Sequence, residues 1–593
     1  MPASAAAEDR KRKRTSLACD TCRVRKVRCD GRDPCLTCSS AGEECTYGLE
    51  TSPKSKTDIV LDVALRSERL LREMSARLVQ NDQPVNIVSS PVAVISPAPT
   101  DSTRRQFEIE HNISNAILSP FHASTTESIL AWPHFDHLQS LRQDYSFSVF
   151  NLENSRPSFP QLPSAIQPYA SRSDIERTIQ NFSQNVNFWY PTMTRTKLRA
   201  SQQIMTSGRL DDSESSCLAL LVMALGSASA LVASVAEYDD PVPEETENRS
   251  QWKVMSELYF DSALKKLHVA QMECTIDSVQ CLFFAGLFFA FLQRPVQAWS
   301  FLSSAATKCR LLLLSQGSNI GLEDYECLRR IFWSCYILES DYLAELSALP
   351  QSGISDIESS IPLPGEFDTH DSPLDKEKSS LYFLACISIR RLLNRVHNLL
   401  YAKDTGASFD DAQFPSVVSE LDHQLEQWRE LLPPDFQFDA SWSPAQSPQG
   451  GFLRQRYLTC RSVIYRPYLN WALSNSADID GLPEDVYENC KRCLQACWMH
   501  GLNLKSFAHT VMVDTWICSL SMASAMLILL AASQITALQN CIRPISPVIG
   551  PHLEGLLRSW MHLPGQSGVS PSVKRSIELI GEVSQSLKEI IGD

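Results

Sequence analysis

The sequence predicts a mainly α-helical protein: a small module built on six cysteines, a short coiled coil and a mostly disordered linker, followed by a large all-helical domain. Three observations lead to this fold class. Six cysteines lie between residues 19 and 45 in a spacing that occurs twice. Residues 81–170 are rich in Pro, Ser, Thr and Asn, a composition typical of disordered linkers. From residue 173 to 593, apolar side chains recur at helical spacing without convincing strand alternation.

The charge of the chain is distributed unevenly. The 593 residues carry a formal net charge of −14, which by itself argues against nucleic acid as a partner. Residues 10–28 hold nine basic residues and one acid, so they carry +8, and subtracting this from −14 leaves −22 for the remainder. A basic arm on an acidic body is the asymmetry expected of a DNA-binding segment attached to a domain that repels DNA.

The cysteine spacing is C-x2-C-x6-C-x5-C-x2-C-x6-C, formed by Cys19, Cys22, Cys29, Cys35, Cys38 and Cys45. No signal peptide is expected at the N-terminus, so these thiols should lie in a reducing compartment and serve metals rather than disulfides. A structural zinc ion prefers four thiolate or imidazole ligands. No histidine precedes His111, so two ions reach four ligands each only if two thiolates bridge them. The symmetry of the repeat points to Cys19 and Cys35 as the bridges, and we expect two Zn²⁺ per chain.

Four cations lie between the second and third cysteines of the cluster. Six thiolates and two Zn²⁺ sum to a net charge of −2, which these cations can offset while they also face DNA phosphates. The alternative is a solvated basic face without a partner. The four residues are Arg23, Arg25, Lys26 and Arg28.

A second basic run precedes the cluster, in an arm that we place at residues 1–18. It has the composition of a nuclear import signal, and it can also contact the DNA backbone. A solubilising tail is the alternative. The run consists of Arg10, Lys11, Arg12, Lys13 and Arg14.

Residues 19–45 resemble the fungal Zn(II)2Cys6 binuclear cluster family, through the Cys-Arg-Val-Arg-Lys-Val-Arg-Cys-Asp run at 22–30 and the loop proline Pro34. The resemblance implies two short helices around the metals, in a DNA-binding domain at residues 19–48. It implies that each cluster reads a CGG-like triplet in the major groove through the pair Arg25-Lys26, with Lys26 as the main contact. Donation from Arg or Lys to guanine is the commonest specific contact there. The other two cations, Arg23 and Arg28, are then expected at phosphates, which position the domain without specifying sequence.

A heptad segment follows at residues 58–80. Its apolar and small residues are spaced four, three, four, three and four apart, which is the repeat of a short parallel coiled coil. The positions are Val60, Ala64, Ser67, Leu71, Met74 and Leu78. Members of the resembled family usually have a dimer coil here, so we expect a homodimer on two triplets. A single amphipathic helix packed on the large domain is the alternative.

The large domain should hold a dozen or so helices. Residues 255–270 contain one helical stripe of apolar side chains. Pro295 is expected to begin a helix. Gly365, the proline pair at 433–434 and the stretch 443–451 are expected to mark loops between helices.

Residues 175–405 resemble the fungal transcription-factor regulatory region, also called the middle homology region. Many members have Gly-Arg-Pro near Ala348, and its absence indicates a different branch. The resemblance implies an all-helical regulatory domain, among whose helices a small-molecule effector could bind. It rests on residues 329–339, 349–354 and 361–364, with a further match at 457–469.

Two other features are expected to be structural. The uncharged stretch between Asp514 and Arg543 is interrupted by polar residues and lacks a basic flank, so we expect a buried helix and no membrane span. Three cysteines and a histidine share one helical face, but they spread over about 15 Å, too far for one tetrahedral ion. We expect core side chains at these positions, which are Cys490, Cys493, Cys497 and His500.

The sequence contains no Ser/His/Asp set, Gly-rich phosphate loop or supported carboxylate pair, so we expect no enzyme. The expected function is that of a nuclear RNA polymerase II transcription factor, which binds double-stranded DNA as a homodimer and recruits transcription machinery or coregulators. Family analogy implies control of a secondary-metabolite gene cluster or of nutrient metabolism. The alternative is a zinc-cluster scaffold or corepressor that acts through protein contacts.

Overall fold

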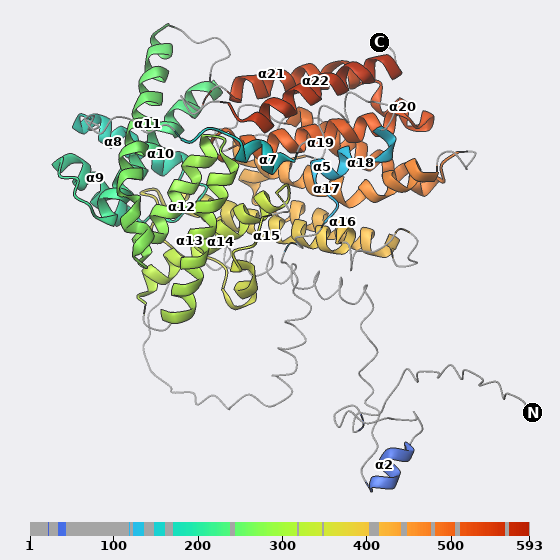
Figure 1. Cartoon of the computed structure of the whole chain (residues 1–593), viewed down its shortest axis with the longest axis horizontal. Helices are drawn as coiled ribbons and strands as arrows, with labels where there is room; N and C mark the ends of the chain where they lie inside the picture. The colour runs from blue at the N-terminus through green and yellow to red at the C-terminus, as the bar shows by residue number, and fades with distance from the viewer. Residues whose placement is uncertain are drawn as a thin grey trace, which may run out of the picture. The chain divides into compact units, whose positions relative to one another are not determined.

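Figure 1 shows the computed structural model of the chain. The chain divides into two units, residues 1–59 and 60–593, and each is described by itself. The basic arm at 1–18 and the heptad segment at 58–80 lie outside the described residues. Described are residues 22, 34–42, 118, 122–135, 148–159, 170–237, 243–316, 320–346, 349–402, 409, 414–439, 447–475, 481–503, 510–561, 563 and 569–591.

The first unit contains one short described helix, α2 (Leu36–Ala41). In the second unit the described residues form helices and no strand, and one isolated antiparallel bridge joins His122 to Ala402. Its N-terminal helices are α5 (Thr126–Leu130), the 3₁₀ turn η1 (Pro133–Phe135), α7 (Val149–Asn154), α8 (Arg172–Asn185), α9 (Arg195–Ser207), α10 (Glu214–Glu237), α11 (Pro243–Met272), α12 (Ile276–Phe291), α13 (Pro295–Gln316) and α14 (Leu322–Leu343).

The C-terminal half of the second unit continues the same architecture. Among the described residues it is helical from the 3₁₀ turn η2 to the last helix, so the predicted all-helical domain is confirmed. The elements are η2 (Ile354–Ser360), α15 (Pro373–Tyr401), α16 (Phe414–Glu430), the 3₁₀ turn η3 (Pro434–Phe436), α17 (Pro448–Asn475), α18 (Glu484–Asn503), the π-helical turn η4 (Thr510–Asp514), α19 (Thr515–Ser533), α20 (Thr536–Ile542), α21 (Ser546–Met561) and α22 (Pro571–Ile591).

Local chemistry explains where several helices begin. Thr275 and Ser278 exchange side-chain to backbone hydrogen bonds in a capping box at the start of α12. Pro295 begins α13, as predicted. The loop predicted at 443–451 ends earlier than expected, because α17 already begins at Pro448. Gly450 is inside that helix, where a Cβ atom would come within 3.1 Å of the Phe436 carbonyl oxygen. This glycine therefore allows close packing and does not make a turn.

The core lies around α10, α12 and α19. Helix α10 packs on α8, α11 and α12, and α19 packs on α18 and α22. In Figure 1 the green helices α10 to α14 gather on one side of the unit and the orange and red helices α17 to α22 on the other. Two apolar stretches, Glu214–Ala233 and Met512–Ser533, are long enough to cross a membrane, but each is 89% buried within the fold. They are core helices of this domain, as predicted for the stretch after Asp514.

The packed domain includes elements that precede residue 173. Ile129 of α5 and Phe135 of η1 are fully buried, and Val149 of α7 is 6% exposed. Helix α5 packs on α19, and α7 packs on α13 and α22. The described part of the stretch 81–170 therefore differs from the mostly disordered linker that its composition predicts. A few apolar side chains, separated by many polar ones, are enough to fix these short helices to the larger core.

Candidate metal centre and regulatory domain

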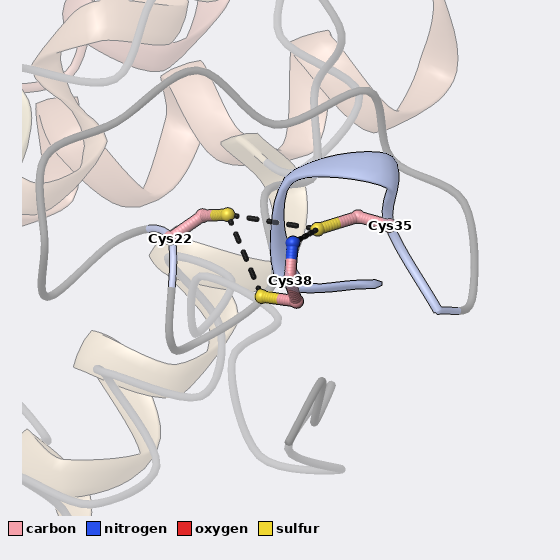
Figure 2. Close-up of side chains that lie close together, drawn as sticks. All are labelled: Cys22, Cys35 and Cys38. Atoms are coloured by element: carbon pink, nitrogen blue, oxygen red, sulfur yellow. Dashed lines mark hydrogen bonds between the residues drawn. The ribbon is translucent and has the colours of Figure 1, made fainter. Parts of the chain in front are cut away.

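Three thiols converge in the first unit. The Sγ atom of Cys22 lies 3.6 Å from that of Cys35 and 3.8 Å from that of Cys38. The three sulfur atoms all lie within 4.8 Å of one another, and the three residues are at most 2% exposed. Figure 2 shows the sulfur of Cys22 facing the other two across the start of α2. The predicted ligands Cys22, Cys35 and Cys38 are thus brought together.

Helix α2 positions two of these thiols. Cys35 is its N-cap residue, and its Sγ atom accepts a hydrogen bond from the backbone N–H of Cys38 at 3.3 Å. Such a bond favours the thiolate form, which is the form that binds metals. The helix ends at Gly42, whose φ of 66° is left-handed and suits a residue without a side chain.

The distances fit a zinc site. Zn–S bonds of about 2.3 Å in a tetrahedron place two sulfur ligands of one ion about 3.8 Å apart. The two measured separations, 3.6 and 3.8 Å, match this value. The thiols come from sequence positions 13 and 16 residues apart. Three buried sulfurs in this geometry can hold a soft metal ion and complete its shell with a further ligand.

The other residues predicted for the cluster and for DNA lie outside the described residues. Their roles therefore remain predictions from the sequence. They are the cysteines Cys19, Cys29 and Cys45, the cations Arg23, Arg25, Lys26 and Arg28, and the basic run Arg10, Lys11, Arg12, Lys13 and Arg14.

In the helical domain, buried hydrogen bonds join residues of the stretches that carry the resemblance, and residues next to them, to one another. Arg330 of α14 is fully buried, and its Nε atom donates to Glu326 Oε1 at 2.8 Å. Its Nη2 atom donates to the Gly365 carbonyl oxygen at 2.6 Å, and the backbone N–H of Gly365 returns a bond to Glu326. Burial lowers the pKa of Arg330 to about 9. This pair of residues fixes the loop around Gly365, which was predicted as a loop, to the middle of α14.

Two further residues of α14 hold the neighbouring loop segments. The indole N–H of Trp333 donates to the Pro362 carbonyl oxygen at 2.9 Å. The Glu339 carboxylate accepts from both the backbone N–H and the hydroxyl of Ser352, at 2.7 and 3.0 Å. The motif at 329–339 therefore holds the loops at 349–354 and 361–364 in place through hydrogen bonds. Its aromatic residues Phe332, Trp333 and Tyr336 are buried core side chains.

Helix α17 contains the fourth stretch of the resemblance, residues 457–469. Pro467 lies inside the helix, and because proline has no N–H, the carbonyl of Val463 loses its helical partner. The hydroxyl of Tyr401 donates to that carbonyl at 2.6 Å. An aromatic residue of α15 thus replaces the missing backbone bond.

A buried ionic network joins the three helices α14, α15 and α17. Asp341 of α14 accepts from Arg390 Nη1 at 2.7 Å and from Arg456 Nη2 at 2.8 Å. Burial alone would raise the pKa of Asp341, but the charges of Arg456 and Arg390 outweigh it and hold the pKa below its ordinary value. Arg390 also donates to Asn394 and to the Ser340 carbonyl oxygen. The sequence analysis did not single out these residues, since charged positions 49 and 115 residues apart give no local pattern.

This network forms part of the wall of a cavity of about 120 Å³. Helices α15, α17, α18 and α19 and the segment before α5 contribute side chains to it. Polar groups at its wall include Arg466, His397 and Glu345, and apolar ones include Leu393 and Ile528. The volume exceeds that of a single water site several times. A small organic molecule is the kind of ligand that such a space admits.

The four residues of α18 that superficially resemble a metal site are buried. None is more than 4% exposed, and Cys493 Sγ donates to the Ser462 carbonyl oxygen. His500 contacts the side chain of Gln455, and burial lowers its pKa to about 4. Helical packing accounts for the set, which is Cys490, Cys493, Cys497 and His500.

Two regions of the chain match known domain families. Residues 17–54 match the fungal Zn(2)-Cys(6) binuclear cluster domain. Residues 179–430 match the fungal specific transcription factor domain. The first match contains the three converging thiols, and the second runs from α8 to the end of α16.

Curated relatives extend the similarity over most of the chain. A protein of Aspergillus rugulosus named as the transcription factor ecdB is 26% identical over 514 residues, which cover 82% of this chain and 83% of that protein. A transcriptional regulatory protein of Schizosaccharomyces pombe, C16G5.16, is 24% identical over 538 residues. An ABC-transporter-regulating transcription factor of Aspergillus fumigatus is 22% identical over 568 residues. The matched regions cover 62% of each of these last two proteins.

The thiol cluster, the helical domain and these matches agree with the resemblance found in the sequence. The cofactor follows from the matched cluster domain and from the chemistry of the three thiols, and it is a pair of zinc ions. The chain contains the two domains of fungal zinc-cluster transcription regulators, and the curated proteins that it resembles are fungal transcription regulators.

Proposed function

We propose that the protein is a nuclear, sequence-specific regulator of RNA polymerase II transcription that binds CGG-like triplets as a homodimer. The observation that carries this proposal is the convergence of Cys22, Cys35 and Cys38 at distances that suit shared zinc ions. A segment this small cannot bury enough apolar surface to fold alone, so the metals supply its folding free energy. The folded cluster then presents its cationic segment to DNA.

The full ligand set of the proposal has six cysteines and two bridging thiolates. Cys35 is one of the proposed bridges by the symmetry of the repeat, and its sulfur lies within 4.8 Å of the sulfur atoms of Cys22 and Cys38. Cys19 is the other bridge by the symmetry of the repeat. The proposed ligands are Cys19, Cys22, Cys29, Cys35, Cys38 and Cys45.

The proposed DNA contacts separate into two classes that one experiment distinguishes. Lys26, with Arg25 beside it, reads guanine, and Arg23 and Arg28 bind phosphates. Fluorescence anisotropy with the full chain would compare a duplex holding two CGG triplets with one in which both are scrambled. Lys26→Ala should cost about 1–3 kcal/mol on the CGG duplex and little on the scrambled one. Arg23→Ala should weaken both equally and lower the slope of log K against log salt by about 0.9.

The competing function is a scaffold or corepressor that keeps the cluster and acts through protein contacts. It predicts the same binding to both duplexes in wild-type protein and no selective effect of Lys26→Ala. Equal affinity for the CGG and scrambled duplexes would therefore reject sequence-specific recognition and favour the scaffold.

Dimerisation is proposed to occur through the heptad segment at 58–80. Replacing Leu71 and Leu78 by Ser removes two seam positions, and the protein should then sediment as a monomer and bind one triplet as well as two. A wild-type protein that already binds a single triplet as tightly as a correctly spaced pair would exclude the proposed dimer.

Nuclear entry is proposed to depend on the basic run at 10–14. Replacing its five residues by Ala in a fluorescent fusion of the full chain should leave the protein in the cytoplasm, whereas Lys56→Ala should not. Nuclear accumulation of the five-residue variant would reject the assignment.

The regulated genes are proposed to belong to one secondary-metabolite cluster or one nutrient pathway. The relative from Aspergillus fumigatus is named for regulating ABC transporters, so transporter genes are a third class to include. Genome-wide occupancy mapping should place the protein at promoters of a single functional group, and occupancy scattered across unrelated promoters would contradict a pathway-specific role.

A further inference from the structure

Arg466, next to Pro467 in α17, is a buried cation without an ion-pair partner among the described residues. It is 5% exposed, and no carboxylate of the described residues forms an ion pair with it. Its one hydrogen bond goes from Nη1 to the Ser124 carbonyl oxygen, at 3.0 Å. Its guanidinium also lies 5.9 Å from the centre of the Tyr401 ring. A guanidinium has five N–H donors, so most of its donors are not matched by protein acceptors.

The other two arginines of the same cavity wall differ from Arg466. Arg390 and Arg456 both bind the Asp341 carboxylate, at distances of 2.7 to 3.2 Å. Each of the two is therefore in direct contact with a carboxylate, and the charge of Asp514 also acts on Arg456. Burying an uncompensated charge costs several kcal/mol. The contrast identifies Arg466 as the position where a bound anion would be most favourable.

The histidines at or next to the cavity do not supply further charge. His397 and His500 line the wall, and burial lowers the pKa of His500 to about 4. His122 lies next to the wall, in contact with Ser124. His122 Nε2 faces the Leu343 carbonyl oxygen at 3.4 Å, so this nitrogen carries the proton and Nδ1 accepts from the Ser124 hydroxyl at 2.6 Å. The hydroxyl has one proton, so His397 Nδ1 must donate to it, at 2.8 Å. Burial lowers the pKa of His397 well below its ordinary value. Both rings are thus neutral, and His397 keeps an acceptor on Nε2.

The carboxyl group of Glu345 interacts electrostatically with Arg466, and its charge changes near neutral pH. Burial raises the pKa of Glu345 to about 7, and the backbone N–H of Thr126 opposes this rise through a hydrogen bond of 2.9 Å. Two other charges act on it, the Arg466 guanidinium from α17 and the Glu127 carboxylate from α5. Near neutral pH, protonation of Glu345 leaves the cavity with more positive than negative charge.

The remaining wall is suited to an apolar body. Leu393, Phe452 and Val463 lie on α15 and α17, and Ile517 and Ile528 lie on α19. Ligand sites in proteins commonly combine apolar walls with a few charged groups that fix one end of the ligand. A molecule with a carboxylate at one end and a short hydrocarbon or aromatic body fits this distribution.

We propose that this cavity of the regulatory domain binds a small organic acid, whose carboxylate pairs with Arg466 and whose apolar part packs between α15, α17 and α19. The role of this ligand as an effector of transcription rests on the proposed function. The binding of the ligand does not, because it can be measured without DNA.

The test is isothermal titration calorimetry of the full chain with four acids, butyrate, hexanoate, octanoate and benzoate, each compared with its uncharged amide. At least one acid should bind with a stoichiometry of one, at least tenfold more tightly than its amide. Arg466→Gln should weaken that acid at least tenfold. The matched control Arg543→Gln, at an exposed position outside the cavity, should leave it unchanged.

Two further variants keep the test decisive if Arg466→Gln does not fold. Ala344→Leu places extra volume at the cavity wall and should abolish binding while Arg466 is retained. Because a bound carboxylate favours protonated Glu345, affinity should rise about tenfold from pH 8 to pH 6. Glu345→Gln should remove most of that dependence.

Several results would overturn the proposal. These are no binding by any of the four acids, equal binding of acids and amides, wild-type affinity in Arg466→Gln, or wild-type affinity in Ala344→Leu. Each of them would reject the pairing of a bound carboxylate with Arg466 in this cavity. Acid binding by a protein that shows no preference for CGG duplexes would instead contradict the proposed function and leave the ligand site intact.

Discussion

The carboxyl group of Glu345 should make the stability of the helical domain depend on pH, and Glu345→Gln should remove that dependence. The side chain lies just after α14 and accepts a hydrogen bond from the Thr126 backbone at 2.9 Å. A glutamine oxygen can accept the same bond. The substitution therefore removes the ionisable group and keeps the contact.

The direction of the effect follows from the two states. Burial raises the pKa of Glu345 from 4.5 to about 7 in the folded protein. The group then holds its proton more tightly when folded, so its stabilising contribution is complete below pH 4.5 and is lost as the pH rises through 7. The full difference corresponds to about 3 kcal/mol, and about 2 kcal/mol of it falls between pH 5.5 and pH 8.

The assay is urea unfolding of the full chain at pH 5.5 and pH 8, followed by tryptophan fluorescence of the helical domain. The difference in unfolding free energy between Glu345→Gln and wild type is measured at each pH. This difference should shift in favour of the variant by about 2 kcal/mol from pH 5.5 to pH 8. The control Glu366→Gln removes the same charge at an exposed position and should show no such change. An equal difference between Glu345→Gln and wild type at the two pH values would refute the reasoning.

Four other substitutions test the packing of the same domain by urea unfolding. Asp341→Asn breaks the buried ionic network and leaves two arginines uncompensated, so it should cost about 3–5 kcal/mol, and a cost below about 1 kcal/mol would contradict a compensated network. Gly550→Ala would place a Cβ atom 2.3 Å from the Ser584 hydroxyl oxygen and should cost about 1–3 kcal/mol, whereas Gly555→Ala in the same helix meets no atom within 4 Å and should stabilise by up to about 1 kcal/mol. Equal effects of the two would reject the close approach of α21 and α22. Tyr401→Phe leaves the Val463 carbonyl without its hydrogen-bond donor and should cost about 1–3 kcal/mol. An unchanged urea midpoint would show that this hydrogen bond does not stabilise the domain.

The features that the sequence predicted correctly are those with a local cause. The thiol spacing reflects metal ligation within a few turns of chain, and three of the six predicted ligands converge in the described residues. Pro295 begins its helix because proline fits a first turn and not an interior. The apolar stripe at 255–270 lies on one helix, α11, as its spacing predicts.

The features that the sequence did not predict depend on distant parts of the chain. Gly450 resembles a loop residue, but its role is the close contact with Phe436. Arg466 and Asp341 are single charged residues within helices, and no periodicity shows that one is paired and the other is not. The short helix α5 is held by packing on α19, about 400 residues later, for example through the hydrogen bond between Thr126 and Ser524. Such partners are identified only once the chain is folded.

Metal analysis of the purified full chain, paired with DNA binding before and after chelation, tests the central claim most directly. The account predicts two zinc ions per chain, with selective binding to the CGG duplex that is lost on chelation and restored by zinc. A protein that holds fewer zinc ions, or that keeps its selective binding after they are removed, would contradict it.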